Sequence, residues 1–417
     1  MDGGGRLPPG AVADAARQAS EAARAAFSDA QAPGVPCATC PPPDTSDTEL
    51  DGALVGRRCR PLTNPRAKGR LKPRQEIVAW ADTGMGGQVP VFGDRPEDVG
   101  VKRQALTRAE VRNAFTPGNM VQPTSRCCEK MNAGRTPQRI VYTNGILTDL
   151  RTHCETLRKI AEATCASVLG VYNATEGPVN DLTQVATDRS LIQQAAAGKR
   201  VAVGDRRNPA VDTLSDLMFR GARHPDEVGG ELPDFWAHSQ GGAITSLALY
   251  DADASLRLRG IDDAFANTRV TSFNAAAPRW VDGPAYTHYV HQADFVGMRT
   301  GIGAAHGDPA IAGAGATVVE FSDPSPRDVM RRGPAPWPGG EPNYQWREYQ
   351  AGAPTGHGFG APKTGPSAWN PANTSHHGID GPGLGVYRQR QLATGGPVCP
   401  EPTSTTERLA ARDRAGQ

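Results

Sequence analysis

The sequence contains no long apolar run and almost no net charge, and these two absences exclude several classes of protein. No segment approaches the ~20 consecutive apolar residues that a membrane-spanning helix needs, so we do not expect an integral membrane protein. Lysine and arginine number 45 against 44 aspartates and glutamates, so no overall electric field would attract nucleic acid. No apolar region of a conventional signal peptide follows Met1–Gly10, which leaves the location open between the cytoplasm and export by another route.

Apolar residues are also scarce, whereas glycine and proline are abundant. Hydrophobic residues make up 38% of the 417 residues, and the 48 glycines and 36 prolines together make up about a fifth. A chain of this length still suffices for one large buried core. We therefore expect a compact domain joined to long irregular segments.

Between residues 136 and 395, short apolar runs alternate with helical patterns. Arg139–Thr143 is the first strand candidate, and Thr148 or Asp149 is placed to cap the helix that follows it. The other expected elements are strands at Ser167–Tyr172, Pro233–His238, Arg269–Asn274, Tyr286–His291 and Ala316–Phe321, one helix between Val179 and Met218, and another at Gly241–Leu249. This alternation predicts an α/β fold, with a mostly parallel central sheet covered by helices on both faces.

The remaining segments differ from this domain in composition. Residues 1–33 are a flexible or helical N-terminal segment, and residues 34–135 are an irregular region rich in Cys and Pro, with a short strand at Glu76–Ala81. Residues 396–417 form a C-terminal tail. Inside the domain, the Gly- and Pro-rich residues 301–372 form either a lid or acyl-binding wall, or an inert surface excursion.

The segment Ala237-His238-Ser239-Gln240-Gly241 has the residues expected around a nucleophile. It lies between a strand and a helix, and the small residues Ala237 and Gly241 permit a tight turn that presents the Ser239 hydroxyl at the carboxyl edge of the sheet. The helix that follows directs backbone N–H groups to this point, so the amide of Gln240 is a candidate oxyanion donor. The turn Asn144-Gly145-Ile146 after the first strand offers the second candidate, the amide of Ile146. The alternative is an ordinary helix-capping serine.

A serine nucleophile needs an imidazole base and an acid that orients it. Asp294 follows a strand end and is the candidate acid; the alternative is an aspartate that only forms a turn. The candidate base is His377 or, alternatively, His376, on a loop after the last strand. The less favoured positions are Asp251, Asp253, Asp308 and Asp323 for the acid, and His238, His288, His291 and His357 for the base.

These residues resemble the α/β-hydrolase superfamily. The strings IVYTNGI, WAHSQGGAITSLAL and YVHQADFVG resemble its lipase-type members, including bacterial phospholipase-like secreted effectors, over roughly residues 137–390. The resemblance implies a serine esterase, lipase or phospholipase that works through an acyl-enzyme, without metal or organic cofactor. Two positions depart from the family pattern: Asn144 stands where many relatives carry a histidine, and Ala237 replaces the first glycine of the turn.

Other functions stay open at this point. An amidase or peptidase would use the same triad, and a non-catalytic protein would use the sheet as a scaffold while residues 1–135 bind a protein partner. For the hydrolase we expect a small-molecule or lipid ester as substrate and a transient contact with a membrane surface. We expect no nucleic acid partner.

The eight cysteines are compatible with disulfides, thiols or a metal site. Cys37-x-x-Cys40 has the spacing of zinc ligands, and Cys127-Cys128 would complete the set. Adjacent cysteines make poor co-ligands, so disulfides or plain thiols are favoured over zinc. Cys154 and Cys165, on or beside the first helix of the domain, are expected to pack in the core.

Overall fold

The computed structural model describes the chain in separate stretches. These are residues 45–65, 77–82, 88–92, 105–196, 208–257, 259–292, 294, 296–297, 301–302, 308–322, 345–351, 379, 383–395 and 399. The N-terminal segment 1–33, Cys37, Cys40, His357, His376 and His377 lie outside the described residues, as does most of the tail 396–417.

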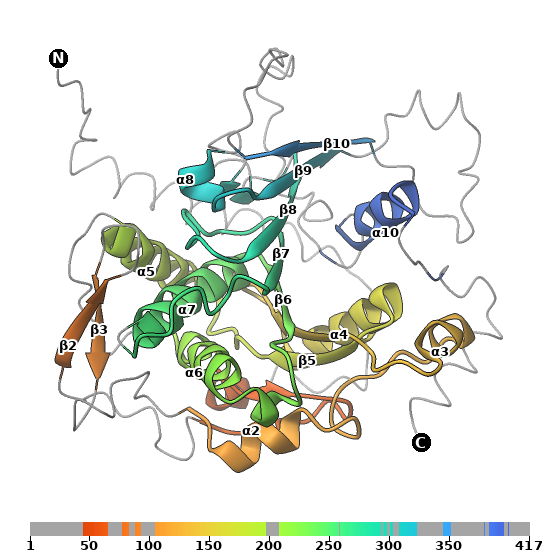
Figure 1. Ribbon diagram of the computed structural model, residues 1–417, viewed down its shortest axis with the longest axis horizontal. Helices are drawn as coiled ribbons and strands as arrows, with labels where there is room; N and C mark the ends of the chain where they lie inside the picture. The colour runs from red at the N-terminus through yellow and green to blue at the C-terminus, as the bar shows by residue number, and fades with distance from the viewer. Residues whose placement is uncertain are drawn as a thin grey trace.

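An eight-stranded sheet runs through the centre of the described structure (Figure 1). Its strands are β1 (Leu54–Val55), β4 (Arg139–Thr143), β5 (Ser167–Val171), β6 (Asp234–His238), β7 (Arg269–Phe273), β8 (Ala285–His291), β9 (Thr317–Ser322) and β10 (Gln345–Gln350). They lie in the order β1-β5-β4-β6-β7-β8-β9-β10, in which neighbours from β5 through β9 are parallel and both edge strands are antiparallel. The predicted α/β class with a mostly parallel sheet is confirmed.

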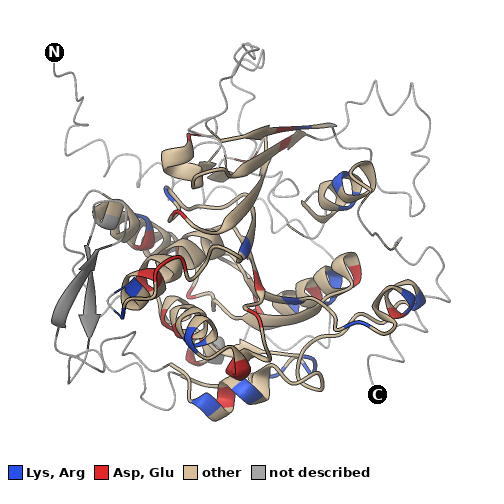
Figure 2. Ribbon diagram, in the orientation of Figure 1, with Lys and Arg blue, Asp and Glu red and all other residues tan. Residues whose placement is uncertain are grey.

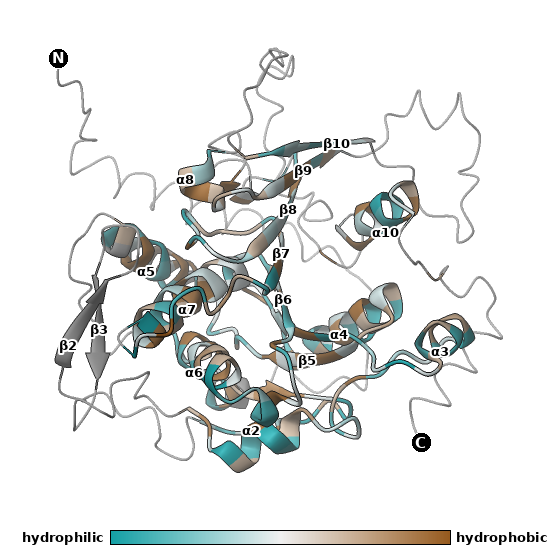
Figure 3. Ribbon diagram, viewed as in Figure 1, coloured by the Kyte–Doolittle hydropathy of each residue, from teal (hydrophilic) through white to brown (hydrophobic). Residues whose placement is uncertain are grey.

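Helices cover both faces of this sheet. The helices α5 (Pro178–Ala196), α6 (Pro209–Arg223) and α7 (Gln240–Arg257) lie on one face, and α4 (Leu150–Thr164) and α10 (Leu384–Ala393) lie on the other (Figure 1). Side chains alternate between the two cores along each strand: Val141 of β4 packs with α6 and α7, whereas its neighbours Ile140 and Tyr142 pack with α4. Because both faces are buried, inner strands such as β4 and β5 are mostly apolar, whereas the edge strand β10 is mostly polar (Figure 3).

Residues before the expected domain start also contribute to this sheet and core. β1 pairs with β5 at one edge, and Val121 forms a bridge with Val168. The other elements of this region are η1 (Thr45–Leu50), α2 (Arg108–Ala114), α3 (Arg126–Asn132) and a separate two-stranded sheet of β2 (Ile77–Asp82) and β3 (Gln88–Phe92). The described part of 34–135 is therefore more regular than its composition suggests, because partners distant in sequence stabilise short elements.

One expectation about the later elements needs correction. One helix was expected between Val179 and Met218, but the structure has two, because Asn208 caps a new helix by accepting a hydrogen bond from Ala210 N–H and Pro209 occupies its first turn. The stretch 301–372 contributes the helix α8 (Pro309–Ala312), the expected strand β9 and the strand β10, which pairs with β9 along its whole length. Its residues 323–344 and 352–372 lie outside the described residues, so the choice between a lid and a surface excursion stays open.

Disulfides link the described cysteines in pairs. They are Cys59–Cys154, Cys127–Cys399 and Cys128–Cys165. Cys154 and Cys165 are buried as expected, and each is also bonded to a cysteine distant in sequence. Cys399, in the predicted tail, is joined to α3.

The described helices carry charges of both signs, in agreement with the near-zero net charge of the sequence. Basic and acidic residues are interspersed along α2, α3 and α4 rather than separated by sign (Figure 2). Among the described residues, no helix has both the length and the apolar character needed to cross a bilayer.

Candidate active site

Ser239 occupies a tight turn between β6 and α7. Its φ of 54° lies in the left-handed region, which is unfavourable for a residue with a side chain. The Ser239 N–H donates to the Phe273 carbonyl at 3.0 Å, and the Ser239 carbonyl accepts from Ala276 at 2.8 Å and Gly242 at 3.0 Å. These bonds tie the turn to the end of β7, and they hold the strained conformation in place.

Glycines allow neighbouring backbone to approach this turn closely. A Cβ atom at Gly145 would lie 2.6 Å from Ser239 Cβ and 3.1 Å from Ser239 Oγ, and a Cβ at Gly241 would lie 2.3 Å from the Thr143 carbonyl oxygen. The Gly145 backbone is therefore in direct contact with the serine side chain. Ser239 is 3% exposed, and its hydroxyl has no hydrogen-bond partner among the described residues.

One predicted oxyanion donor follows Ser239 in the chain, and the other follows the glycine that contacts Ser239. Gln240 is the first residue of α7, and Ile146 follows the glycine that touches Ser239. Within the part of the chain that the structure describes, neither the Gln240 nor the Ile146 backbone N–H donates a hydrogen bond. Both amides are thus available to a developing negative charge on a substrate oxygen.

A buried network of side-chain amides lies beside the turn. The Asn144 side chain accepts from the Asn173 N–H at 2.9 Å and donates to the Asn173 carbonyl at 2.7 Å. Asn173 Nδ2 donates to Gln240 Oε1 at 2.9 Å, and Asn173 Oδ1 accepts from Asn208 Nδ2 at 2.9 Å. All four residues are buried, so the network joins the end of β5 to the loop after β4 and to the first residues of α6 and α7.

Two aspartates of α5 extend this support. The Asp181 carboxylate accepts from the Leu147 N–H at 3.1 Å, from the Glu176 N–H at 2.7 Å and from the Thr175 hydroxyl at 2.7 Å. The Asp188 carboxylate accepts from Gln240 Nε2 at 3.2 Å. Asp181 therefore positions the loop that carries Ile146, and Asp188 helps to orient the Gln240 side chain.

Asn173, Asp181 and Asp188 were not among the predicted site residues. The one signal available was that Asn173 is a polar residue directly after an apolar strand, where parallel sheets place functional side chains. Asp181 and Asp188 gain their partners only when α5 folds over the sheet.

Asp294 lies in the turn after β8, at the same edge of the sheet as Ser239. Its N–H donates to the His291 carbonyl at 2.9 Å, and its Oδ1 accepts from the Gly297 N–H at 2.6 Å. The carboxyl ends of β6, β7 and β8 lie side by side at this edge, because the three strands are parallel neighbours. Asn274, directly after β7, accepts a hydrogen bond from the His291 N–H at the end of β8, at 2.8 Å. Asp294 is buried, and it forms the turn that was expected if the residue had only a structural role. Its role as the catalytic acid stays a prediction.

The structure does not test the predicted base, since His376 and His377 lie outside the described residues. His288, one of the less favoured histidines, is buried, with Nδ1 2.7 Å from Ser272 Oγ and Nε2 2.9 Å from the Ala312 carbonyl. Both of its ring nitrogens are engaged, and burial lowers the pKa of His288 to about 4. This Ser–His pair is therefore a structural contact inside the sheet.

No protein-family model and no curated protein matches the sequence.

Replacing Asn173 with alanine is expected to lower the free energy of unfolding by about 2–5 kcal/mol, because Gln240 Oε1 and Asn208 Nδ2 would lose their buried partner. Urea denaturation of the variant and the wild type measures this loss. Asn180→Ala is the matched control, since Asn180 is exposed on α5 and makes one bond of 3.3 Å to the Glu176 carbonyl. Equal stability of the two variants would contradict the importance of the network.

Proposed function

We propose that this protein is a serine hydrolase of the α/β-hydrolase type that cleaves carboxylic esters, with lipid esters as the expected substrate class. The observation that carries the proposal is the position of Ser239 on a strained turn between a parallel strand and a helix. Such a turn is the way in which α/β-hydrolases present their nucleophile. A serine that merely caps a helix needs no left-handed backbone, because cap residues ordinarily adopt extended φ and ψ values.

The surroundings of Ser239 support acyl transfer. The Gln240 and Ile146 amides are free of other hydrogen bonds among the described residues, and the Ile146 peptide adjoins the glycine that touches the serine. Asp181 and the amide network hold both donors in place before any substrate arrives. Preorganised donors of this kind stabilise the oxyanion of a tetrahedral intermediate.

The path of the chain after the predicted base supports His377, or alternatively His376, as the partner of Ser239. Ile379 is buried in the same core cluster as Phe273, and a Cβ at Gly383 would lie 3.0 Å from a Phe273 ring carbon. The Phe273 carbonyl is the group bonded to the Ser239 N–H. The described residues that follow the predicted base therefore pack against the residue whose carbonyl holds the Ser239 turn, and this supports the proposal of His377 or His376 as the base.

In the proposed mechanism Ser239 attacks the ester carbonyl while the histidine accepts the hydroxyl proton. The negative oxygen is held by the Gln240 and Ile146 amides, and the histidine then returns the proton to the departing alcohol. Water attacks the resulting acyl-enzyme by the same sequence of proton transfers. Asp294 orients the imidazole and stabilises its charged form.

The expectation of an apolar substrate has one structural support. Leu147 is 38% exposed, which is unusual among the large apolar side chains of the described residues, and it follows Ile146 at the edge of the candidate site. An acyl chain or a lipid surface that contacts Leu147 would remove this side chain from water.

Labelling with a fluorophosphonate probe tests the proposal. Wild type is expected to be labelled, with the adduct on the Ser239 peptide in mass spectrometry, and Ser239→Ala is expected to remain unlabelled. Ser272→Ala is the matched control, because it removes the hydroxyl of the buried Ser–His pair and should leave labelling intact.

Labelling of Ser239→Ala at the wild-type level would refute the proposal, and absence of labelling in every variant would favour a non-catalytic scaffold. Hydrolysis of p-nitrophenyl acyl esters compared with the matching anilides then separates an esterase from an amidase or peptidase. Release of p-nitrophenol without cleavage of the anilide is expected.

A further inference from the structure

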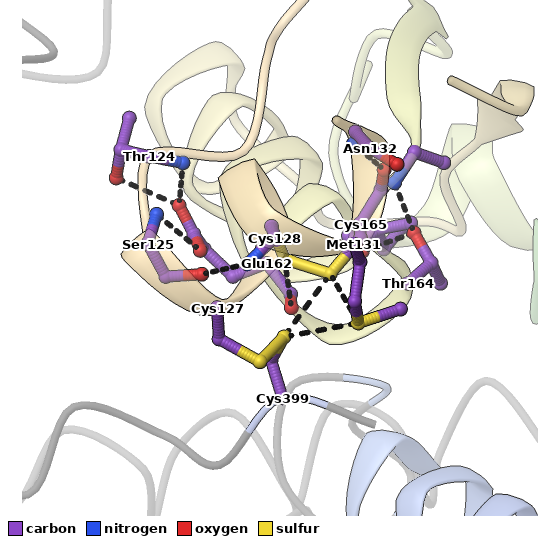
Figure 4. Close-up of a disulfide and its surroundings, with 12 residues drawn as sticks. Thr124, Ser125, Cys127, Cys128, Met131, Asn132, Glu162, Thr164, Cys165 and Cys399 are labelled. Atoms are coloured by element: carbon purple, nitrogen blue, oxygen red, sulfur yellow. Dashed lines mark hydrogen bonds between the residues drawn. A yellow bond between two sulfur atoms is a disulfide. The ribbon is translucent and has the colours of Figure 1, made fainter. Parts of the chain in front are cut away.

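Five sulfur atoms meet at the interface of α3, α4 and the C-terminal segment (Figure 4). Cys165 precedes the start of β5 and Ser239 follows the end of the parallel strand β6, so the cluster and the candidate active site lie at opposite edges of the sheet. The Sγ atoms of Cys165 and Cys399 are 3.3 Å apart although they belong to different disulfides. Met131 Sδ lies 3.3 Å from Cys399 Sγ and 3.7 Å from Cys165 Sγ. The Sγ atoms of Cys128, Cys165 and Cys399 are buried and lie within 4.8 Å of one another.

We propose that this cluster, once its disulfides are reduced, is a binding site for one thiophilic d10 metal ion, Zn²⁺ or Cu⁺, held by the thiolates of Cys127, Cys128, Cys165 and Cys399. A tetrahedral zinc–tetrathiolate site with Zn–S bonds of about 2.3 Å places its sulfur atoms about 3.8 Å apart. Three of the four sulfur atoms, those of Cys128, Cys165 and Cys399, lie within 4.8 Å of one another, and the non-bonded pair Cys165 and Cys399 is 3.3 Å apart. The fourth, Cys127 Sγ, is bonded to Cys399. Ligands that are all sulfur favour such soft ions over Mg²⁺ or Ca²⁺.

The adjacency of Cys127 and Cys128 does not prevent shared coordination here. Cys127 is bonded to Cys399 and Cys128 to Cys165, and those two partners are in contact. The side chains of the two neighbours therefore converge on one cluster, which the sequence spacing alone argued against.

The scaffold that positions Cys128 and Cys165 does not depend on the disulfides. The Glu162 carboxylate of α4 accepts from the Ser125 N–H at 3.2 Å and from the Thr124 hydroxyl at 2.7 Å, and so attaches the start of α3 to α4. Asn132 Nδ2, at the end of α3, donates to the Cys165 carbonyl at 2.8 Å. None of these contacts involves a sulfur atom, so we expect them to persist when the sulfur–sulfur bonds are reduced (Figure 4).

Conversion of the disulfide-bonded cluster into the metal-bound cluster balances in electrons and protons. Two equivalents of a dithiol reduce the two disulfides to four thiols and leave as two oxidised dithiols. Burial opposes ionisation of a free thiol, whereas a bound cation stabilises the thiolate, so Zn²⁺ displaces the four protons as it binds. Because the same sulfur atoms serve both forms, oxidation and metal binding exclude each other, and Cys399 stays attached to α3 in either.

Metal uptake by the reduced full-length chain tests this proposal. The background is Cys37→Ser/Cys40→Ser, which removes the CxxC pair that has zinc-ligand spacing of its own. After reduction with a phosphine and exclusion of oxygen, Co²⁺ is expected to bind as one equivalent with the thiolate-to-metal charge-transfer absorption of a tetrahedral sulfur site. Zn²⁺ should displace it, and a parallel titration with Cu⁺ shows which ion binds more tightly.

In this background, the additional changes Cys165→Ser/Cys399→Ser are expected to abolish uptake, whereas Cys59→Ser/Cys154→Ser should retain one equivalent. The proposal is overturned if the background protein takes up neither Zn²⁺ nor Cu⁺, or if the Cys165/Cys399 variant binds as much metal as the Cys59/Cys154 variant.

Alkylation of the reduced protein provides a readout that needs no variant of the cluster. With Zn²⁺ present, Cys127, Cys128, Cys165 and Cys399 are expected to lose reactivity toward iodoacetamide, while Cys59 and Cys154 react equally with and without the ion. Peptide mass spectrometry reports each site. A protection pattern that does not distinguish these two groups would also overturn the proposal.

Discussion

Substitution of Asp294 by asparagine is expected to lower the rate of ester hydrolysis by about 10⁴-fold, the effect of an amide in place of the carboxylate that orients a catalytic histidine. Asparagine keeps an Oδ1 that accepts the hydrogen bond from the Gly297 N–H, so the turn after β8 is preserved. It cannot stabilise an imidazolium, and it favours the wrong tautomer of the imidazole. Steady-state hydrolysis of a p-nitrophenyl ester and the melting temperature of the variant measure both consequences.

Asp308→Asn is the matched control for this substitution. Asp308 also accepts a local backbone hydrogen bond, from the Ala310 N–H at 2.9 Å, but it does so at the exposed start of α8. Its replacement should leave the rate unchanged. If Asp294→Asn hydrolyses the ester as fast as wild type while Ser239 is still labelled by the probe, Asp294 only forms the turn and the orienting acid must be sought elsewhere.

Acidification from pH 7.5 to 4.5 is expected to remove about 2–3 kcal/mol of stability through His153 alone. His153 of α4 is fully buried between Tyr142, at a ring distance of 5.6 Å, and Tyr172, at 5.3 Å. Burial lowers the pKa of His153 to about 3 from its ordinary value of 6.5. Below pH 6.5 His153 is protonated in the unfolded chain but stays neutral in the folded chain. The contribution of His153 to the free energy of unfolding is therefore fully present above pH 6.5 and decreases as the pH falls to about 3.

The variant His153→Phe tests this pH dependence, because it keeps an aromatic ring between the two tyrosines and removes the titrating group. Its free energy of unfolding, from urea denaturation at each pH, is expected to fall by about 2–3 kcal/mol less than that of wild type over the same interval. His288 remains in both proteins, so its own contribution cancels. Identical pH slopes for the two proteins would show that His153 does not control acid stability.

The inner strands were predictable from the sequence, and the edge strands were not. β4 has the predicted bounds Arg139–Thr143, because a strand buried on both faces must be apolar at successive positions. The predicted cap at Asp149 is also present, since its side chain accepts from the Thr152 N–H at 2.6 Å. β1 has only two residues and β10 is mostly polar, so neither carries a periodic signal, and both exist because a neighbouring strand offers unpaired backbone groups.

Some features of the candidate site depend on adjacent residues and were predictable, whereas others depend on distant residues and were not. The turn at Ser239 was visible as a short pattern of small residues between a strand and a helix, because its geometry depends on adjacent positions. Asn173 and Asp181 were not visible, because their hydrogen bonds join segments that meet only after the sheet has assembled.

What this sequence determined by itself is local: where apolar runs form buried strands, where helices begin, and where a serine sits on a tight turn. Only the tertiary structure decided which cysteines pair, which loop touches Ser239, and how Asn144, Asn173 and Gln240 share their hydrogen bonds. The physical reason is the distance along the chain over which each interaction acts. Strand and turn preferences follow from steric and solvation effects within a few residues, whereas a disulfide across 272 residues or a buried amide network depends on where the folded backbone brings distant side chains together.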